Sequence, residues 1–140
     1  MGGYKHIEKS IGAYIAAQYH DVVEVGIGQN TDAARVLFEA GAKIRATDVK
    51  NFPQPDWLSF FVDDIFDPEF FRYSGADAIY AIRPAEEMIP PLIALAQRLD
   101  CDLVVYHLGF ELFGNGGERI DCGVILHRYY RCQNPSKSVD

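Results

Sequence analysis

Apolar and polar residues follow two different periods along the chain, and these periods predict helices and strands in alternation. Four apolar residues recur at the spacing of one helix face and predict a helix over residues 5–19. They are Ile7, Ile11, Tyr14 and Ile15. The later apolar runs are short and rich in Val and Ile, as in strands that are covered on both faces. Strands are expected at residues 21–27, 43–48, 59–66, 77–84, 101–109 and 124–131, and further helices at 31–41, 68–73 and 91–99.

Capping and helix-breaking residues set the expected boundaries of these elements. Asn30 or Thr31 is expected to cap the second helix, and Gly41 is expected to end it. The prolines at positions 90 and 91 are compatible only with the first turn of the last helix, because a proline in a helix interior removes a hydrogen bond and clashes with the preceding turn.

The alternation of strands with helices predicts an α/β fold, a three-layer doubly wound sheet that is mostly parallel. The connection before the last strand is short and rich in glycine, so it cannot hold a crossover helix. The last strand is therefore expected to run antiparallel beside the fifth. Right-handed crossovers with one reversal of winding give the strand order 3-2-1-4-5-6, with a ligand site at the reversal point between strands 1 and 4. Residues 1–132 are expected to form one Rossmann-like domain, and residues 133–140 a disordered tail.

Composition narrows the class of protein. The 140 residues suit one domain, and 49% of them are hydrophobic, which is enough for a sizeable core. No apolar run reaches the roughly 18 residues of a membrane span, and the N-terminus is too polar for a secretory signal. These features predict a soluble cytoplasmic protein without membrane partners. The net charge of -7 and the scattered basic residues disfavour direct binding of nucleic acid. The three cysteines form no CxxC pair, so neither a disulfide framework nor a metal site is expected.

The stretch "VVEVGIGQNTD" carries the first candidate chemistry. Gly26 and Gly28 follow a strand and precede a helix, where glycine permits a tight turn and a close approach of a ligand to the backbone. Asp48 ends the second strand about 20 residues further on, where a ribose-binding acid is expected. The combination indicates a nucleotide-type ligand at the reversal point, although a glycine pair alone also suits an ordinary turn.

The acid that precedes the glycines separates two classes of ligand. Glu24 would repel a pyrophosphate at this turn, and Thr31 replaces the third glycine of a dinucleotide site, so both residues count against NAD. S-adenosylmethionine carries a sulfonium and an ammonium group, which a carboxylate attracts. Asp48 would still bind the ribose hydroxyls, and Asp63 or Asp64 at the end of strand 3 would accept hydrogen bonds from the adenine amino group.

Three short segments resemble a known enzyme family. "EVGIGQN", "RATD" and "VDDIF" look like motifs I, II and III of the class I S-adenosylmethionine-dependent methyltransferases, and the resemblance covers about residues 20–107. With "IYAIRP" on strand 4, the short chain more narrowly resembles an uncharacterised family of small methyltransferase-like proteins found mainly in archaea. The resemblance implies a Rossmann-like fold and S-adenosylmethionine as the cofactor. It implies cofactor contacts from Glu24, Gly26, Gly28, Asn30, Asp48 and Asp64.

The chain departs from the methyltransferase pattern at several places. Asn30 or Thr31 stands where the motif has its third glycine, and "AIRPAEE" replaces the Asn-Pro-Pro-aromatic signature of amino-group methyltransferases. The helix between strands 5 and 6 and a seventh strand are not expected from the sequence.

Two residues are candidates for catalysis. Arg83 ends strand 4 and can hold a carboxylate or phosphate of an acceptor substrate, or it can pair with Glu86 or Glu87 in a purely structural role. His107 follows strand 5, with Glu111 nearby, and can act as a general base or as a hydrogen-bonded part of the core.

The functional hypotheses come from three classes. The first is a methyltransferase of unknown acceptor, the second an NAD-dependent oxidoreductase, and the third a non-catalytic Rossmann-like interaction or regulatory module. The glycine-rich segment 114–117 can be a mobile lid over the substrate or a simple hairpin loop. The oligomeric state stays open.

Overall fold

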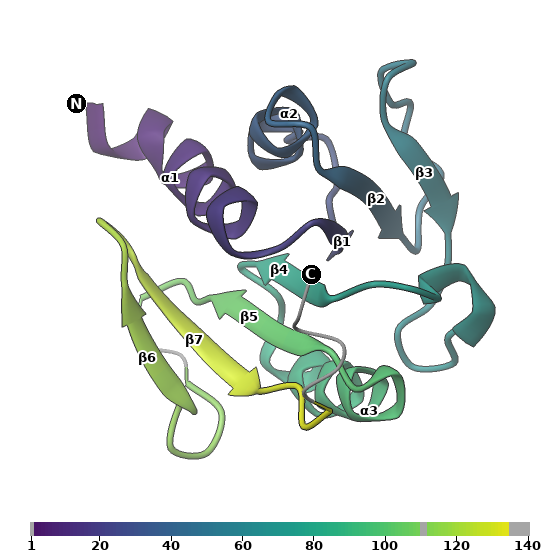
Figure 1. The fold of residues 1–140 in the computed structure, drawn as a ribbon, viewed down its shortest axis with the longest axis vertical. Coiled ribbons are helices and arrows are strands. Elements are labelled where there is room, and N and C mark those ends of the chain that lie inside the picture. The colour runs from purple at the N-terminus through teal and green to yellow at the C-terminus, as the bar shows by residue number, and fades with distance from the viewer. Residues whose placement is uncertain (1, 110–111, 135–140) are drawn as a thin grey trace.

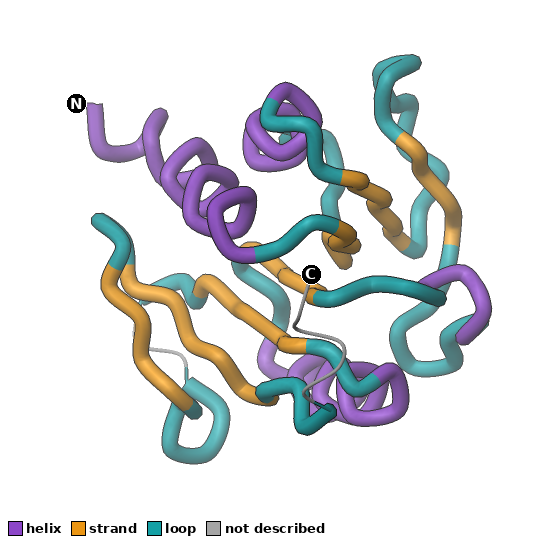
Figure 2. Tube along the Cα trace, in the orientation of Figure 1, coloured by secondary structure: helices purple, strands orange, loops and turns teal. Residues whose placement is uncertain are grey.

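The computed structural model describes residues 2–109 and 112–134, with side chains from residue 6 onward. Helices and strands alternate along most of the chain, and the strands form one central sheet (Figures 1 and 2). The elements are α1 (Gly2–Gln18), β1 (Asp21–Val25), α2 (Asp32–Glu39), β2 (Lys43–Asp48), β3 (Ser59–Val62), η1 (Phe70–Tyr73), β4 (Ala78–Ile82), η2 (Glu86–Met88), α3 (Ile89–Leu99), β5 (Asp102–Tyr106), β6 (Glu118–Asp121) and β7 (Ile125–Tyr130).

The sheet has the order β3-β2-β1-β4-β5-β7-β6. Strands β1 to β5 are parallel, and β7 runs antiparallel to both β5 and β6. The predicted α/β doubly wound fold is therefore confirmed, as is the antiparallel return of the last strand beside the fifth. The reversal of winding lies between β1 and β4, as predicted.

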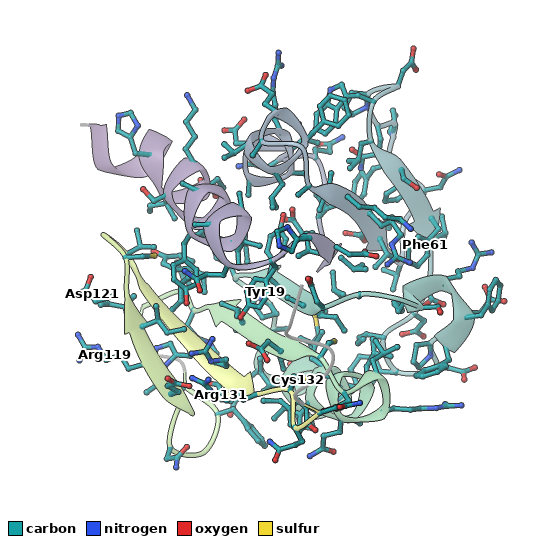
Figure 3. All side chains as sticks on the ribbon, in the orientation of Figure 1. Tyr19, Phe61, Arg119, Asp121, Arg131 and Cys132 are labelled. Carbon is teal, nitrogen blue, oxygen red and sulfur yellow. The ribbon has the colours of Figure 1, made fainter. Side chains whose placement is uncertain are left out.

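The sequence missed one strand. Residues 118–121 were assigned to a polar glycine-rich loop, but they form the edge strand β6 and bring the number of strands in the described sheet to seven. Arg119 and Asp121 carry charged, exposed side chains (Figure 3). An edge strand of this kind contains no apolar run, so the sequence pattern does not predict it.

Each face of the sheet is covered by its own helices (Figure 1). On one face α1 and α2 pack against the strands, with Ile11, Ile15 and Leu37 fully buried. On the other face α3 and η1 cover the sheet, with Leu92 and Tyr73 buried beneath them. This layering supplies the two hydrophobic cores that the short apolar strands require.

The helix boundaries follow the expected signals with small differences. The prolines at positions 90 and 91 lie in the first turn of α3, as predicted, and Gly41 follows α2 with a φ of 89°. Thr31 is the N-cap of α2 but makes no side-chain cap bond. Instead, the Asn30 Oδ1 atom accepts a hydrogen bond from the Asp32 N–H at 3.0 Å, which closes a local turn ahead of the helix.

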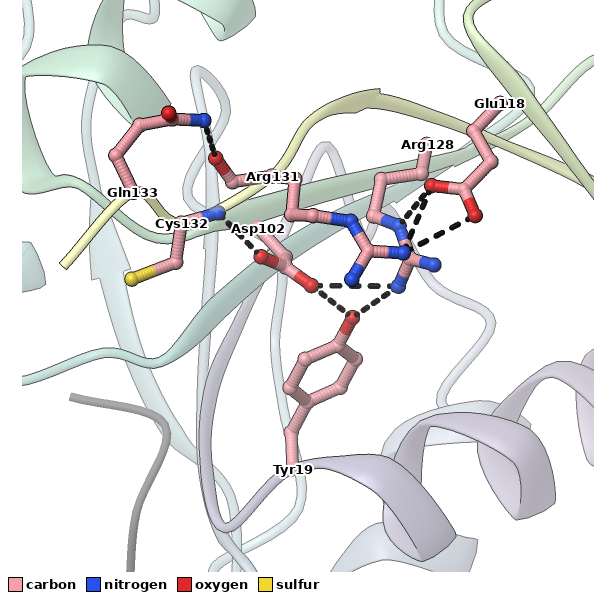
Figure 4. A network of polar contacts seen from close by, with 7 residues as sticks. All are labelled: Tyr19, Asp102, Glu118, Arg128, Arg131, Cys132 and Gln133. Atoms are coloured by element: carbon pink, nitrogen blue, oxygen red, sulfur yellow. Dashed lines mark hydrogen bonds and ion pairs between the residues drawn. The ribbon is translucent and has the colours of Figure 1, made fainter. Parts of the chain in front are cut away.

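A polar network at the amino ends of the strands joins distant elements (Figure 4). The Asp102 carboxylate accepts a hydrogen bond from the Tyr19 hydroxyl at 2.6 Å and from the Arg128 guanidinium at 3.3 Å. Arg128 also pairs with Glu118 of β6 at 2.9 Å. Since Asp102 is 8% exposed, its buried contacts join β5 and β7 to Tyr19, which directly follows α1, while the exposed pair of Arg128 with Glu118 links β7 to β6.

The first residues of the expected tail are held in place. The backbone N–H groups of Gln133 and Asn134 donate to the Asp100 carboxylate at 2.8 and 2.9 Å. Asp100 thus provides hydrogen-bond acceptors for the backbone of these two residues. The rest of the expected tail, 135–140, lies outside the described residues.

Candidate functional site

A cleft of about 380 Å³ opens at the carboxyl ends of β1 to β4, at the reversal of the sheet. Its wall combines apolar side chains with several carboxylates. The residues that line it are Val25, Gly26, Thr47, Asp48, Val49, Asp63, Asp64, Ile65, Phe66, Ile82, Arg83, Pro84, Ala85, Glu87 and Met88. Such an edge is where open α/β sheets bind their ligands.

The glycine turn forms one side of the cleft. Gly26 and Gly28 have φ values of 77° and 59°, a left-handed conformation that other residues rarely adopt. The Gly26 N–H donates to the Thr47 carbonyl at 2.8 Å, so the turn is fastened to β2. A Cβ atom at Gly26 would meet only the Met88 side chain, at 3.9 Å. The turn therefore requires glycine for its backbone conformation and leaves space beside it.

Asp48 connects the glycine turn to the end of β2. Its Oδ2 atom accepts the Gly28 N–H at 2.9 Å, and its Oδ1 atom accepts the Lys50 N–H at 3.2 Å. Gln54 completes the clamp, because its Nε2 atom donates to the Gly28 carbonyl at 2.9 Å. The Asp48 carboxylate lies in the cleft wall and retains acceptor capacity after these two backbone bonds.

The two acids after β3 have different surroundings. The Asp63 carboxylate accepts a hydrogen bond from the Tyr73 hydroxyl at 2.6 Å and from the Glu69 N–H at 3.2 Å. Much of its capacity to accept hydrogen bonds is therefore used within the fold. Burial and this contact raise the pKa of Tyr73. Asp64 is exposed in the cleft, and its carboxylate accepts one described hydrogen bond, from the Phe66 N–H at 3.0 Å. Of the two acids, Asp64 is the better placed to meet a ligand.

Three of the residues expected to contact the cofactor do not line the cleft wall formed by the described residues: Glu24, Gly28 and Asn30. Gly28 supports the turn through Asp48, and Asn30 is engaged with the start of α2. Glu24 lies on the α1 side of the sheet at 2% exposure, and the Tyr80 hydroxyl donates to its carboxyl at 2.8 Å. Burial raises the pKa of Glu24 to about 8, and the charge of Glu8 adds to the rise.

Arg83 lines the cleft but is already paired with an acid. Its guanidinium lies 2.5 Å from Glu8 of α1 and 5.2 Å from the centre of the Tyr106 ring. The expected structural partners, Glu86 and Glu87, take no part in this ion pair. The backbone of Arg83 adopts a left-handed φ of 56°, with its N–H bonded to the Tyr106 carbonyl.

Sequence reasoning missed Glu8, which lies 75 residues before Arg83. One signal was present in the sequence. Glu8 precedes Ile11 by three residues and Ile15 by seven, so it shares their buried helix face. A single acid on such a face indicates a buried partner, because an unpaired buried carboxylate is costly.

His107 does not line the cleft. Its Nε2 atom lies 2.6 Å from the Tyr129 hydroxyl, which accepts the Phe113 N–H, and its ring packs against His127. Burial, with a contribution from His127, lowers the pKa of His107. The hydrogen-bonded role that the sequence allowed for His107 is the one this geometry favours. Glu111, its expected neighbour, lies outside the described residues.

The glycine-rich segment before β6 packs against β7. A Cβ atom at Gly117 would lie 2.5 Å from the Arg128 carbonyl oxygen, and the Gly116 carbonyl accepts a hydrogen bond from His127 Nδ1 at 2.9 Å. In this arrangement the segment 114–117 is a tight turn that leads into the hairpin.

No described helix has both the length and the apolar character to cross a membrane. Within 2–109 and 112–134, no group of three His, Cys, Asp or Glu side chains is arranged to hold a metal ion.

Comparison of the sequence with known families gives a match over most of the chain. The model of the uncharacterised protein family UPF0146 matches residues 8–119. A UPF0146 protein of Archaeoglobus fulgidus is 36% identical over 96 residues, which are 68% of this chain and 74% of that protein. Another, from Pyrococcus horikoshii, is 36% identical over 113 residues, which are 77% of this chain and 86% of that protein. Both relatives come from archaea.

Solved structures with a similar fold are methyltransferases. The sugar N-methyltransferase KedS8 from a Streptoalloteichus species superimposes with a TM-score of 0.58 at 14% identity, over 84% of this chain and 58% of that one. The CcbJ methyltransferase from Streptomyces caelestis gives a TM-score of 0.56 at 13% identity, over 70% and 50%. The chain thus spans about half the length of each of these enzymes. The likeness shows that the fold is the methyltransferase type of Rossmann-like fold.

Proposed function

The chain belongs to the uncharacterised protein family UPF0146, and from the cleft of its methyltransferase-like fold we propose that it binds S-adenosylmethionine. The observation that carries the proposal is the meeting of the left-handed turn at Gly26 with the carboxylates of Asp48 and Asp64 in one cleft. Ribose hydroxyls and the adenine amino group are hydrogen-bond donors, and carboxylates are acceptors. The residues present therefore fit the nucleoside part of this cofactor.

Each residue would have a separate task in binding. Asp48 would accept the ribose hydroxyls, since its two oxygens are oriented by the Gly28 and Lys50 N–H groups. Asp64 would accept the adenine amino group, and the absence of a side chain at Gly26 would let the ligand approach the backbone. Glu24 would act from the buried side of the turn as an acid that favours positive charge.

Transfer of a methyl group to an unknown acceptor is the reaction that suits this cofactor. S-adenosylmethionine supplies an electrophilic methyl group when bound. The chain's own contribution would be alignment of the acceptor and exclusion of water from the cleft. Because Arg83 is neutralised by Glu8, it would hold an anionic acceptor only by exchanging that partner.

The NAD-dependent alternative is disfavoured by charge. The carboxylates of Asp48, Asp63, Asp64 and Glu87 line the cleft, and its one lining cation, Arg83, is paired within the described structure. A pyrophosphate would be repelled here. A non-catalytic interaction module remains the other alternative. A binding experiment distinguishes it from a protein that binds S-adenosylmethionine.

The test is calorimetry with S-adenosylmethionine and S-adenosylhomocysteine, supported by backbone chemical shifts at Gly26 and Asp48. We expect saturable binding by the wild-type chain. Because hydrogen bonds to charged groups contribute about 1.5–3 kcal/mol, Asp64→Asn should weaken binding by about tenfold or more. The matched control is Asp67→Asn, an exposed acid three residues away that does not line the cleft.

Two results would contradict the proposal. One is the absence of heat and of shift changes with either ligand. The other is a saturable fluorescence change with NADH, which would favour the oxidoreductase instead. Specific capture of a protein partner by a chain that binds neither ligand would favour the interaction module.

A further inference from the structure

The strand β6 ends the sheet on one side and has an unpaired outer edge. It pairs with β7, and its other side has no strand partner within 2–109 and 112–134. Such an edge presents a row of backbone N–H and C=O groups to any chain that can pair with it. Figure 3 places Arg119 and Asp121 of β6 on this outer side of the molecule.

The hairpin geometry decides which backbone groups of β6 face outward. The Cys122 N–H donates to the Val124 carbonyl across the hairpin at 3.0 Å. Ile120 lies two residues before Cys122 in the same antiparallel register. Because the hydrogen-bonded pairs of an antiparallel ladder occur at every second residue, Ile120 also directs its N–H and C=O toward β7. Arg119 and Asp121, which flank Ile120, therefore direct theirs away from the sheet.

The two residues with outward backbone groups carry opposite charges. Both side chains are exposed, on the face of β6 opposite Ile120, which packs against the core on the α1 side. Neither Arg119 nor Asp121 takes part in an ion pair among the described residues. The Asp121 carboxylate accepts the Gly123 N–H at 3.2 Å through Oδ1, which leaves it further capacity to accept.

Antiparallel pairing with a second copy satisfies the hydrogen bonds and the charges in one register. A two-fold axis beside Ile120 puts each Arg119 opposite the partner's Asp121, and these are the residues with outward backbone groups. An axis beside Arg119 would instead set two arginines opposite each other, and an axis beside Asp121 two aspartates. A shift by half a residue sets an outward residue opposite an inward one and loses the ladder. The charges therefore select the register centred on Ile120.

We propose that β6 is the contact surface of a symmetric homodimer, in which two sheets join edge to edge through antiparallel β6 strands. Each Arg119 then forms an ion pair and backbone hydrogen bonds with the partner's Asp121. Such a closed pair covers the edge and leaves nothing there for a third chain. The inference is independent of the proposed function, because β6 lies outside the cleft wall.

The expected dimer is weak. Two short strands bury less area than the roughly 1,200–2,000 Å² of a stable interface, so we expect a Kd of about 0.1 mM. Sedimentation velocity of the full chain between about 10 μM and about 1 mM should therefore show monomers giving way to dimers. Over the same range, amide hydrogen exchange should slow at Arg119 and Asp121. The Ile120 amide should be protected at every concentration, because β7 already binds it.

Two variants and their mixture test the charge pairing. Arg119→Asp sets aspartates opposite each other and Asp121→Arg sets arginines opposite each other, so each alone should weaken the dimer by about tenfold or more. An equimolar mixture of the two should form a heterodimer, because every cross-strand pair is then again of opposite charge. Arg35→Asp is the matched control, an equal change of charge at an exposed residue of α2, and should dimerise as the wild type does.

Several outcomes would overturn the proposal. One is a chain that stays monomeric at the highest concentration. Another is a dimer that forms without slower exchange at Arg119 and Asp121, since it would use a different surface. Equal weakening by Arg119→Asp and Arg35→Asp would point to net charge alone, and assemblies that grow beyond two chains would contradict a closed pair. The wild-type concentration series decides the matter even where a variant does not fold.

Discussion

The two ends of the sheet carry similar acids in opposite circumstances. At the amino ends of the strands, Asp21 pairs with Arg45 at 2.7 Å and Asp102 with Arg128 at 3.3 Å. At the carboxyl ends, Asp48 and Asp64 face the cleft, and neither takes part in an ion pair among the residues that the structure describes. The acids at the amino ends are held in ion pairs that join distant elements, whereas the described partners of the Asp48 and Asp64 carboxylates are backbone N–H groups.

This difference shows which end is available to a ligand. A protein with a net charge of -7 places acids together at a cost in free energy, and a natural chain keeps such an arrangement mainly where a function requires it. The four acids of the cleft wall are such an arrangement. The acids of the polar network at the other end are instead paired within the fold.

The largest predicted effect comes from the paired end. Asp102→Ala removes the acceptor of the Tyr19 hydroxyl, of Arg128 and of the Cys132 N–H. Loss of one partner from a buried pair costs about 3–5 kcal/mol, so we expect a loss of about 3 kcal/mol in the free energy of unfolding by urea. Glu39→Ala, which breaks the exposed pair with Arg35, should cost less than about 0.5 kcal/mol. Equal losses for the two variants would contradict the structural role of the network.

The second prediction concerns Glu24, the buried acid near the carboxyl end of β1. The pKa of Glu24 is raised from 4.5 to about 8 by folding, so its contribution to stability is fully present below about pH 4.5 and is lost as the pH rises through 8. Between pH 6 and pH 8 the wild type should lose about 2 kcal/mol more than Glu24→Gln, which lacks the titrating group. Urea unfolding of both chains at several pH values measures this difference. Parallel pH profiles would show that Glu24 is not the group responsible.

A smaller effect is expected at the glycine turn. Gly28→Ala places a side chain at a φ of 59°, which costs about 1–2 kcal/mol in strain although the space beside it is open. Thermal unfolding should show this loss. Gly2→Ala, in the first turn of α1, serves as the control for glycine replacement as such. If Gly28→Ala leaves the thermal stability unchanged, the turn does not require a residue that favours the left-handed conformation.

The smallest effect on stability is predicted for the cleft itself. Asp64→Asn should change the free energy of unfolding by less than about 0.5 kcal/mol, because the acid is exposed and has no described ion pair. The same variant is the one expected to lose ligand affinity. Strong destabilisation by Asp64→Asn would remove the distinction between the two ends of the sheet.

Much of the fold was predictable because its signals are local. The apolar runs located β1 to β5 and β7, and Gly26 and Gly28 marked the turn at the reversal point. The edge strand β6 was not predicted because its side chains are mostly exposed. Exposure on both faces removes the alternation of apolar and polar residues that identifies a strand.

The candidate site was less predictable because its contacts cross long distances in sequence. The positions of Asp48 and Asp64 at the cleft followed from strand order alone. The orientation of Glu24 toward Tyr80, 56 residues away, depends on the registration of β1 with β4, which the sequence does not specify. The same holds for Glu8 and Arg83, whose contact requires the docking of α1 on the sheet.

The insertion of β7 between β5 and β6 has a consequence for the order in which the chain folds. As the chain leaves the ribosome, β6 emerges before β7, yet its described strand partner is β7. Residues 118–121 must therefore wait for residues 125–130, while the five parallel strands already have their neighbours. Nascent chains arrested before residue 125 emerges should leave residues 118–121 open to proteolysis, and protection of these residues would contradict this order.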